Sequence, residues 1–258
     1  MKKIIALLLV VVMAAFSLAS CAELTAAEMV ADANKALEGG RYKATAKISV
    51  DCRNDKYSEA INQIFAAGLD DMEFYFDGKN FQTAISMEMM GFSISMDMSV
   101  VGNTVYYAMG DVKMKATATP EQIEEVIESM NSTDEMLDTS DFSEMTKVEK
   151  DGKTYITCTA YDTEKLNELI EDAEDMYESL SATDVNVDNV KLIATIKDGK
   201  YEELAMSMLY SFKIGNETIE IAMTVGMTFD FNAGKEITAP DDADSYQSVS
   251  FDELGIAG

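Results

Sequence analysis

The chain is dominated by runs in which apolar and polar residues alternate. In Tyr42–Cys52, the first such run, every even position is apolar and the odd positions are Lys, Thr, Ser or Asp. This period of two predicts a β-strand with one face buried and the other in water. Ten further strands are predicted in the same way, at 72–76, 81–89, 92–100, 105–109, 112–116, around 148, at 154–156, around 196, and at 204–214 and 219–231.

Short turns connect the strands of the first half and determine how they pair. These turns are Asp77–Asn80, Met90-Gly91, Gly102-Asn103 and Gly110-Asp111. An even-length loop pairs odd positions with even ones, and the apolar series changes parity at each turn in this way. Met89 is therefore expected opposite Phe92, and Met109 opposite Val112. The five strands are predicted to form an antiparallel meander with its apolar side chains on one face.

The turns of the second half predict the remaining register. Two Lys-Asp-Gly-Lys sequences, at 150–153 and 197–200, suit three-residue loops that end in glycine and preserve parity. Such a loop would place Val148 on the same face as Ile156. Gly215-Asn216 changes parity again, so Met208 is expected opposite Met223.

Four segments have apolar residues at helical spacing. The first starts at Thr25, which forms a capping box with Glu28, and the others are Asp55–Ala67, a helix opened by Pro120, and Glu164–Leu180. The last two strands are far longer than the usual 5–6 residues, and sheets with long strands coil. The predicted fold is α+β: a strongly curved antiparallel half-barrel of about 11 strands, with three or four amphipathic helices covering its concave face. The alternative is two smaller sheets, one for each half of the chain.

The N-terminus has the pattern of a processing signal. Lys2 and Lys3 precede an uncharged apolar run, Ile4–Phe16, that is shorter than the about 20 residues needed to span a bilayer. Leu18-Ala19-Ser20-Cys21 follows and resembles the bacterial lipobox. That resemblance implies removal of residues 1–20, a lipid on Cys21 and an extracytoplasmic protein held to the cell membrane by its lipid. The alternative is an ordinary secretory signal with an incidental cysteine.

The order of elements from residue 21 onward resembles the LolA/LppX/LprG-like lipoprotein superfamily. It runs from a helix through a strand meander to long closing strands and a tail with Ile237-Thr238-Ala239-Pro240. The resemblance implies that residues 21–258 form one domain, a half-barrel whose cavity carries lipids or acyl chains in several members. Anchoring argues against a shuttle such as LolA. The oligomeric state and the protein partners do not follow from it.

Composition excludes several classes of function. The chain has no histidine and a net charge of −27, and signal removal would take two lysines and no acid. Without histidine, serine and cysteine triads and most zinc sites are excluded, so we expect no enzyme, no catalytic residues, no metal site and no cofactor. Nucleic acid is not expected as a partner, because its binding needs basic patches. The acyl chains, not electrostatics, are expected to hold the protein to the membrane.

Methionines define the candidate ligand site. Met-x-Met pairs suit copper(I), but their alternation places them on the apolar face, where a packed core is the simpler explanation. Methionine also lines adaptable apolar grooves, which predicts a lipid or other apolar ligand in the concave face. The rival is a structural or protein-interaction lipoprotein with a fully packed core. The candidate cavity residues are Met87, Met96, Met98, Met206, Met208, Met223, Met227, Leu166 and Tyr177.

Overall fold

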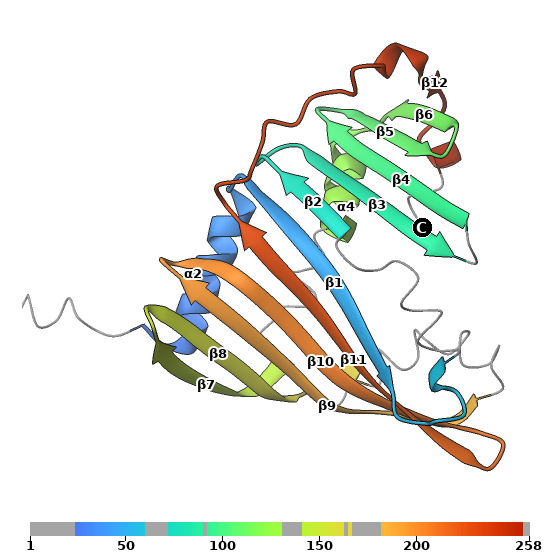
Figure 1. Cartoon of the computed structure of the whole chain (residues 1–258). Helices are drawn as coiled ribbons and strands as arrows, with labels where there is room; N and C mark the ends of the chain where they lie inside the picture. The colour runs from blue at the N-terminus through green and yellow to red at the C-terminus, as the bar shows by residue number, and fades with distance from the viewer. Residues whose placement is uncertain are drawn as a thin grey trace, which may run out of the picture.

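One large twisted sheet organises the computed structural model, which describes residues 24–59, 72–89, 92–130, 141–162, 165–166 and 182–254. For residues 87–89, 92–94, 125 and 127–130, only the backbone is described. The sheet has 12 strands in the order β12-β6-β5-β4-β3-β2-β1-β11-β10-β9-β8-β7 (Figure 1). The strands are β1 (Tyr42–Cys52), β2 (Met72–Phe76), β3 (Phe81–Met89), β4 (Phe92–Val101), β5 (Thr104–Met109), β6 (Val112–Thr117), β7 (Phe142–Lys150), β8 (Lys153–Tyr161), β9 (Ala182–Lys197), β10 (Lys200–Ile214), β11 (Glu217–Asp230) and β12 (Gln247–Ser248).

The predicted half-barrel with three or four covering helices is wrong. The sheet is open, with β12 and β7 at its two edges, and it is mixed because β12 pairs with β6 in parallel. In the described part of the chain, two short α-helices face it: α2 (Ala26–Glu38) and α4 (Pro120–Met130). The predicted helices at 55–67 and 164–180 lie mostly outside the described residues. A strand of two residues is too short for a periodic signal, so β12 was not predicted.

The predicted register of the meander is confirmed. Met89 pairs with Phe92, and Met109 pairs with Val112. Met208 also pairs with Met223 across the β10–β11 turn. Period-two alternation combined with even-length turns therefore predicts these pairings correctly, because a slip of one residue would turn apolar side chains into water.

The predicted loops of the two Lys-Asp-Gly-Lys turns are wrong. Lys150 pairs directly with Lys153, and Asp151 and Gly152 between them have φ of 53° and 74°. Two central residues with positive φ form the tight turn that matches strand twist, so the loop has two residues instead of three. Val148 consequently faces away from Ile156 and is 59% exposed. At the second turn, the register shift after Tyr201 restores the expected parity from Leu204 onward.

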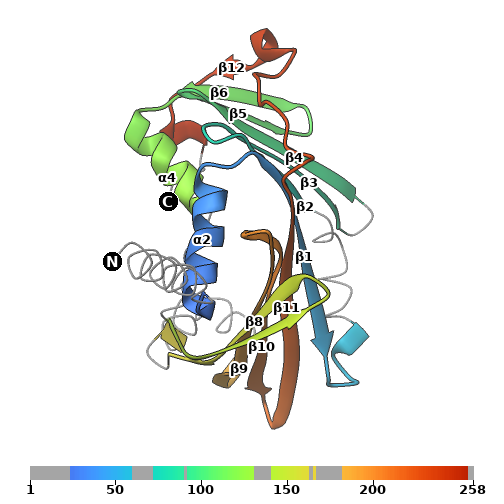
Figure 2. The same cartoon turned by 90° about the vertical axis from the view of Figure 1, so that its left-hand side faces the viewer.

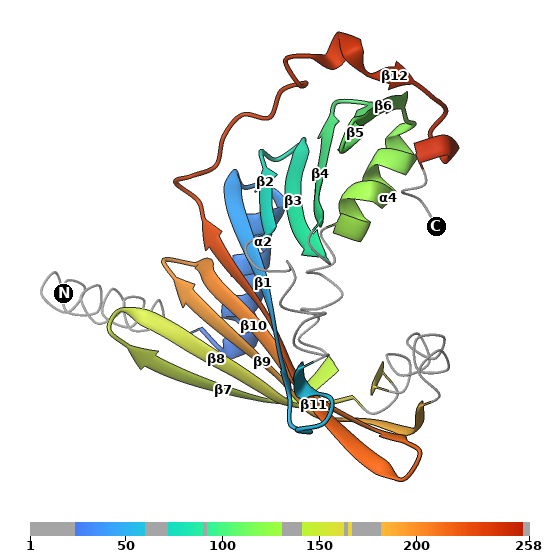
Figure 3. The same ribbon diagram turned by 45° about the vertical axis from the view of Figure 1, so that its right-hand side comes forward.

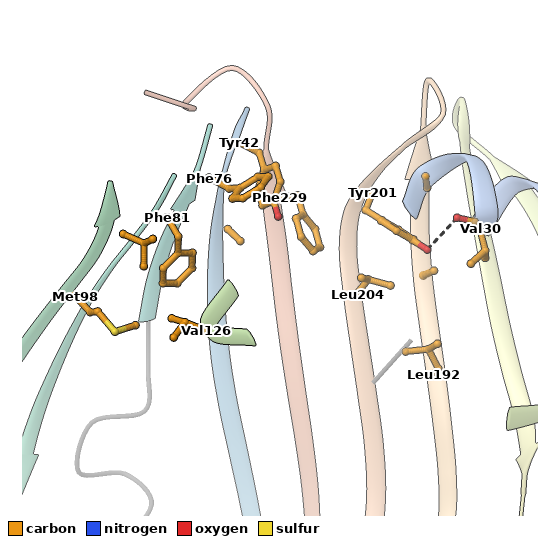
Figure 4. Packing of buried hydrophobic residues seen from close by; sticks show 14 of the residues in the cluster. Val30, Tyr42, Phe76, Phe81, Met98, Val126, Leu192, Tyr201, Leu204 and Phe229 are labelled. Carbon is orange, nitrogen blue, oxygen red and sulfur yellow. Dashed lines mark hydrogen bonds between the residues drawn. The ribbon is translucent and has the colours of Figure 1, made fainter. Parts of the chain in front are cut away.

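The two helices lie on the concave side of the sheet (Figure 2). α2 has the predicted capping box and packs against β10, β9 and β7. Its buried residues Val30 and Ala33 join the core, as do Ile123 and Val126 of α4. Figure 4 shows Val126 beside Phe81, on the half of the sheet formed by the meander. In the described residues, no helix is long and apolar enough to cross a membrane.

The C-terminal segment, residues 231–254, contacts both halves of the sheet. From the end of β11 it runs along the upper edge of the sheet to β6 (Figures 1 and 3). The Ile237 amide donates to Asp77 Oδ2 at 3.0 Å, and β12 then adds to β6. Phe251 and Leu254 are buried in the main core. The segment is therefore part of the fold and not a loose tail.

Candidate functional site: the concave apolar face

Three long strands supply the middle of the concave face. On β1, β10 and β11, every second side chain points to the concave side. These side chains are all uncharged over residues 42–52, 204–214 and 219–229. Near the helices they are buried, as Ala44, Leu204 and Phe229 show. In the middle of the strands most of them are only partly buried, and at the far end Cys52, Phe212 and Ile219 are buried again in a second, smaller cluster. We call these partly buried side chains the apolar strip: Ile48, Val50, Met206, Tyr210, Ile221, Met223, Val225 and Met227.

The pairing of the three strands makes the strip continuous. Ile48 lies opposite Val225, and Val225 lies opposite Met206. The next row pairs Val50 with Met223, and Met223 with Met208. Directly opposite residues on one face have Cβ atoms about 4.5–5.5 Å apart, so neighbouring side chains within a row touch. The result is an apolar surface with unbranched methionines at its centre.

An aromatic cluster bounds the strip on the helix side. The rings of Tyr42 and Phe229 have centroids 5.9 Å apart, and Tyr201 lies 6.0 Å from Phe229. The Tyr201 hydroxyl donates to Asn34 Oδ1 at 2.7 Å. The same hydroxyl lies 3.4 Å from the Val30 carbonyl oxygen, as Figure 4 shows. This buried tyrosine therefore joins α2 to β10 and fixes the helix over the closed part of the face.

Burial acts on two titratable groups of the concave face, Tyr210 and Cys158. Burial raises the pKa of Tyr210, whose ring is part of the strip. Burial also raises the pKa of the Cys158 thiol. Because both groups are held in their neutral forms, neither provides a charge for a polar ligand.

The predicted cavity residues divide into distinct groups. Met206, Met223 and Met227 lie in the strip, whereas Met208 is 6% exposed in the core. The two methionines of β4 are separated from these by β3, β2 and β1: Met98 is buried near Phe81, and Met96 is partly buried. Leu166 packs against the core. The Met87 side chain, Tyr177 and Cys21 lie outside what the structure describes.

Sequence analysis missed five members of the strip. Ile48, Val50, Ile221 and Val225 occupy the same face as the methionines, and their period-two pattern carries the signal that identifies them. Tyr210 has the same signal. The hydrogen bond from Tyr201 to Asn34 has no counterpart in the sequence pattern, because it joins residues 167 positions apart.

The two cysteines of the described chain are separate buried thiols. Cys52 is on β1 and Cys158 is on β8, with β11, β10 and β9 between them. A disulfide needs Cα atoms within about 7 Å, which strands this far apart in a sheet do not provide. Within the described residues, no group of three or more Cys, Asp and Glu side chains could hold a metal ion.

Comparison with known proteins gives a family and two distant likenesses in structure. The model of DUF6612, a family of unknown function, matches residues 25–247. The chain belongs to DUF6612. No curated protein matches this DUF6612 chain. Among solved structures, LprF from Mycobacterium bovis has 11% identity and a TM-score of 0.40, covering 83% of this chain and 94% of LprF. The ywiB protein from Bacillus subtilis has 9% identity and a TM-score of 0.19, covering 76% of this chain and 94% of its own.

The structural match to LprF extends over most of both chains. With a TM-score below 0.5, it is distant and carries no argument about function. The lipobox, Leu18–Cys21, precedes the first described residue and also lies outside the match to DUF6612.

Proposed function

We propose that this DUF6612 chain is a lipid-anchored extracytoplasmic protein that binds an apolar ligand on the concave face of its sheet. The observation that carries the proposal is the apolar strip, a continuous uncharged surface that is only partly buried. In a closed core the same positions would be buried, as Ala44 and Leu204 are nearer the helices. Partly buried apolar side chains in a concave surface are typical of ligand sites.

The chemistry of the strip favours an aliphatic ligand. No charged side chain projects from β1, β10 or β11 on this face over the ranges given above, so an ionised group there would lose its hydration without compensation. Methionine side chains are flexible and polarizable, and they adapt to chains of different shape. The ligand is therefore a lipid tail or a similar hydrocarbon, with any charged headgroup outside the strip.

The lipobox supports the anchor. Cys21 follows Leu18, Ala19 and Ser20 and lies five residues before Ala26, where α2 begins. A lipid on Cys21 would hold α2 and the sheet close to the membrane. Replacing Cys21 with alanine should release the protein from the membrane or leave uncut precursor. Wild-type protein that incorporates no fatty-acid analogue at Cys21 contradicts the anchor.

The same surface favours binding without catalysis. General acid–base catalysis needs a group that exchanges a proton near the working pH. Tyr210 is the titratable group of the strip, and its raised pKa keeps it protonated. We therefore propose that the ligand is held or handed on unchanged.

One observation favours the rival function, a structural or protein-interaction lipoprotein with a packed core. Met98 and Met208, two of the predicted cavity residues, are buried in the core. Titration with a dansyl-labelled fatty acid distinguishes the ligand-binding function from the rival function. Saturable binding at one site supports the ligand-binding function, and a signal that rises without saturation supports the packed core.

A further inference from the structure

The position of the anchor is tightly constrained by the start of the fold. Cys21 is three residues from Leu24, and an extended chain spans at most about 3.6 Å per residue, so the lipid lies within about 11 Å of Leu24. Leu24 is itself tied to the edge of the sheet, because Lys147 Nζ donates to its carbonyl oxygen at 3.1 Å. The lipid therefore emerges beside β7, the edge strand opposite β12.

Two exposed apolar side chains flank β7, Leu24 on the face to which Lys147 points and Val148 on the opposite face. In the described part of the chain, four large apolar side chains are exposed, and two of them are Leu24 at 45% and Val148 at 59%. Val148 is on β7, one residue from Lys147, and the two-residue turn places it on the outer face. The other two, Met109 and Val112, lie on β5 and β6, near the opposite edge of the sheet.

The hairpin that carries Val148 is neutral over residues 142–161, with three lysines and three acids, and its tip is slightly basic. Residues 147–153 contain three lysines and two acids, whereas the whole chain has a net charge of −27. Lys150 is exposed at the turn, and Lys153 reaches Glu202 of β10. Lysine side chains beside exposed apolar residues are suited to the membrane interface, where the stem contacts lipid and the ammonium contacts phosphate.

We propose that the β7–β8 hairpin and Leu24 lie on the phospholipid bilayer, with Val148 and Leu24 in the interfacial layer and Lys150 at the headgroup phosphates. This inference rests on the proposed lipid anchor at Cys21. It assigns the edge strand a partner, the bilayer surface, and gives the anchored protein one orientation. The acyl chains still supply the affinity, because the rest of the chain is acidic.

Tryptophan fluorescence tests this orientation, since the chain contains no tryptophan. The lipidated full-length protein is reconstituted in vesicles of phosphatidylcholine and phosphatidylglycerol with brominated acyl chains, which quench nearby indole rings. Val148→Trp should lose fluorescence and shift its emission to the blue. Val112→Trp changes a valine near the far edge that is 51% exposed, so it is the matched control and should do neither. Adding Lys150→Glu to Val148→Trp should reduce the quenching.

Flotation of the same vesicles separates failure of the orientation from failure of the anchor. If both tryptophan variants float with the vesicles but show equal quenching, the orientation is wrong and the anchor stands. If the wild-type protein does not float, the anchor is wrong and the orientation fails with it. Quenching of Val148→Trp that is unchanged by Lys150→Glu overturns the contact between Lys150 and the phosphates.

Discussion

Replacing Met223 with tryptophan separates a ligand surface from a packed core. Met223 is in the centre of the apolar strip, opposite Val50 on one side and Met208 on the other, and it is only partly buried. An indole ring there would cover the surface on which an aliphatic chain is proposed to lie. Met208→Trp is the matched control, because the same change is made on the neighbouring strand at a side chain that is 6% exposed.

The two variants should differ in stability. Overpacking a filled core costs about 1–3 kcal/mol, or roughly 2–12 °C in Tm for a domain of 150–250 residues. This loss is expected for Met208→Trp. Met223→Trp should stay within about 0.5 kcal/mol of the wild type, because its ring can occupy open space.

The variants should also differ in their response to ligand. A ligand at 100 times its Kd stabilises the folded state by about 2.7 kcal/mol, which corresponds to roughly 5–11 °C. A fatty acid should raise the Tm of the wild type by this amount and leave the Tm of Met223→Trp unchanged. Thermal melts with and without the fatty acid measure both effects. If Met223→Trp melts as low as Met208→Trp, or keeps the full response to fatty acid, the strip is not the ligand surface.

Two further changes test the fold around the strip. Tyr201→Phe removes the hydrogen bond to Asn34 and should lower the free energy of unfolding by about 0.5–1.5 kcal/mol in urea titrations. Tyr155→Phe, on the outer face, is the control and should change the free energy of unfolding little. Equal effects of the two changes would contradict the role of the hydrogen bond. Burial alone would raise the pKa of Asp77, but hydrogen bonds from the Ile237, Asn80 and Lys79 amides and from the Asn80 side chain outweigh it, and the pKa is lowered from 3.8. Since the folded-state pKa is the lower one, the stability that Asp77 contributes is complete above the unfolded pKa near 4 and lost as the pH falls through the folded value. Asp77→Asn should therefore flatten the acid limb of a Tm-against-pH curve, and an unchanged limb would contradict this.

The sequence predicts the pairing of the sheet better than its shape. Alternation and even-length turns place Met89 opposite Phe92 and Met208 opposite Met223, because burial of one face penalises every other register. The Lys-Asp-Gly-Lys turns were misread, since the same four residues can form a loop of two or three. Positive φ at Asp151 and Gly152 distinguishes the two-residue turn, and the sequence alone does not show which loop length the flanking strands select.

The sequence predicts which face of the sheet carries the candidate site, but not how deeply each side chain of that face is buried. A period of two shows that Met206, Met208 and Met223 share a side of the sheet. It does not show that Met208 is covered while Met206 and Met223 remain partly exposed, because depth depends on the curvature of the sheet and on where α2 packs. The alternation pattern also does not predict that the sheet is open. Whether a sheet is open depends on whether its two edge strands pair, and the sequence of a single strand or turn does not indicate this.

Native mass spectrometry of the protein purified from its own membrane tests apolar ligand binding most directly. The expected spectrum shows the folded protein carrying one additional non-covalent mass in the range of a lipid, which is lost on collisional activation. The same mass should be absent from Met223→Trp purified in the same way. A wild-type spectrum that contains only the protein with its covalent anchor, and that stays unchanged after incubation with excess phospholipid or fatty acid, would contradict the account.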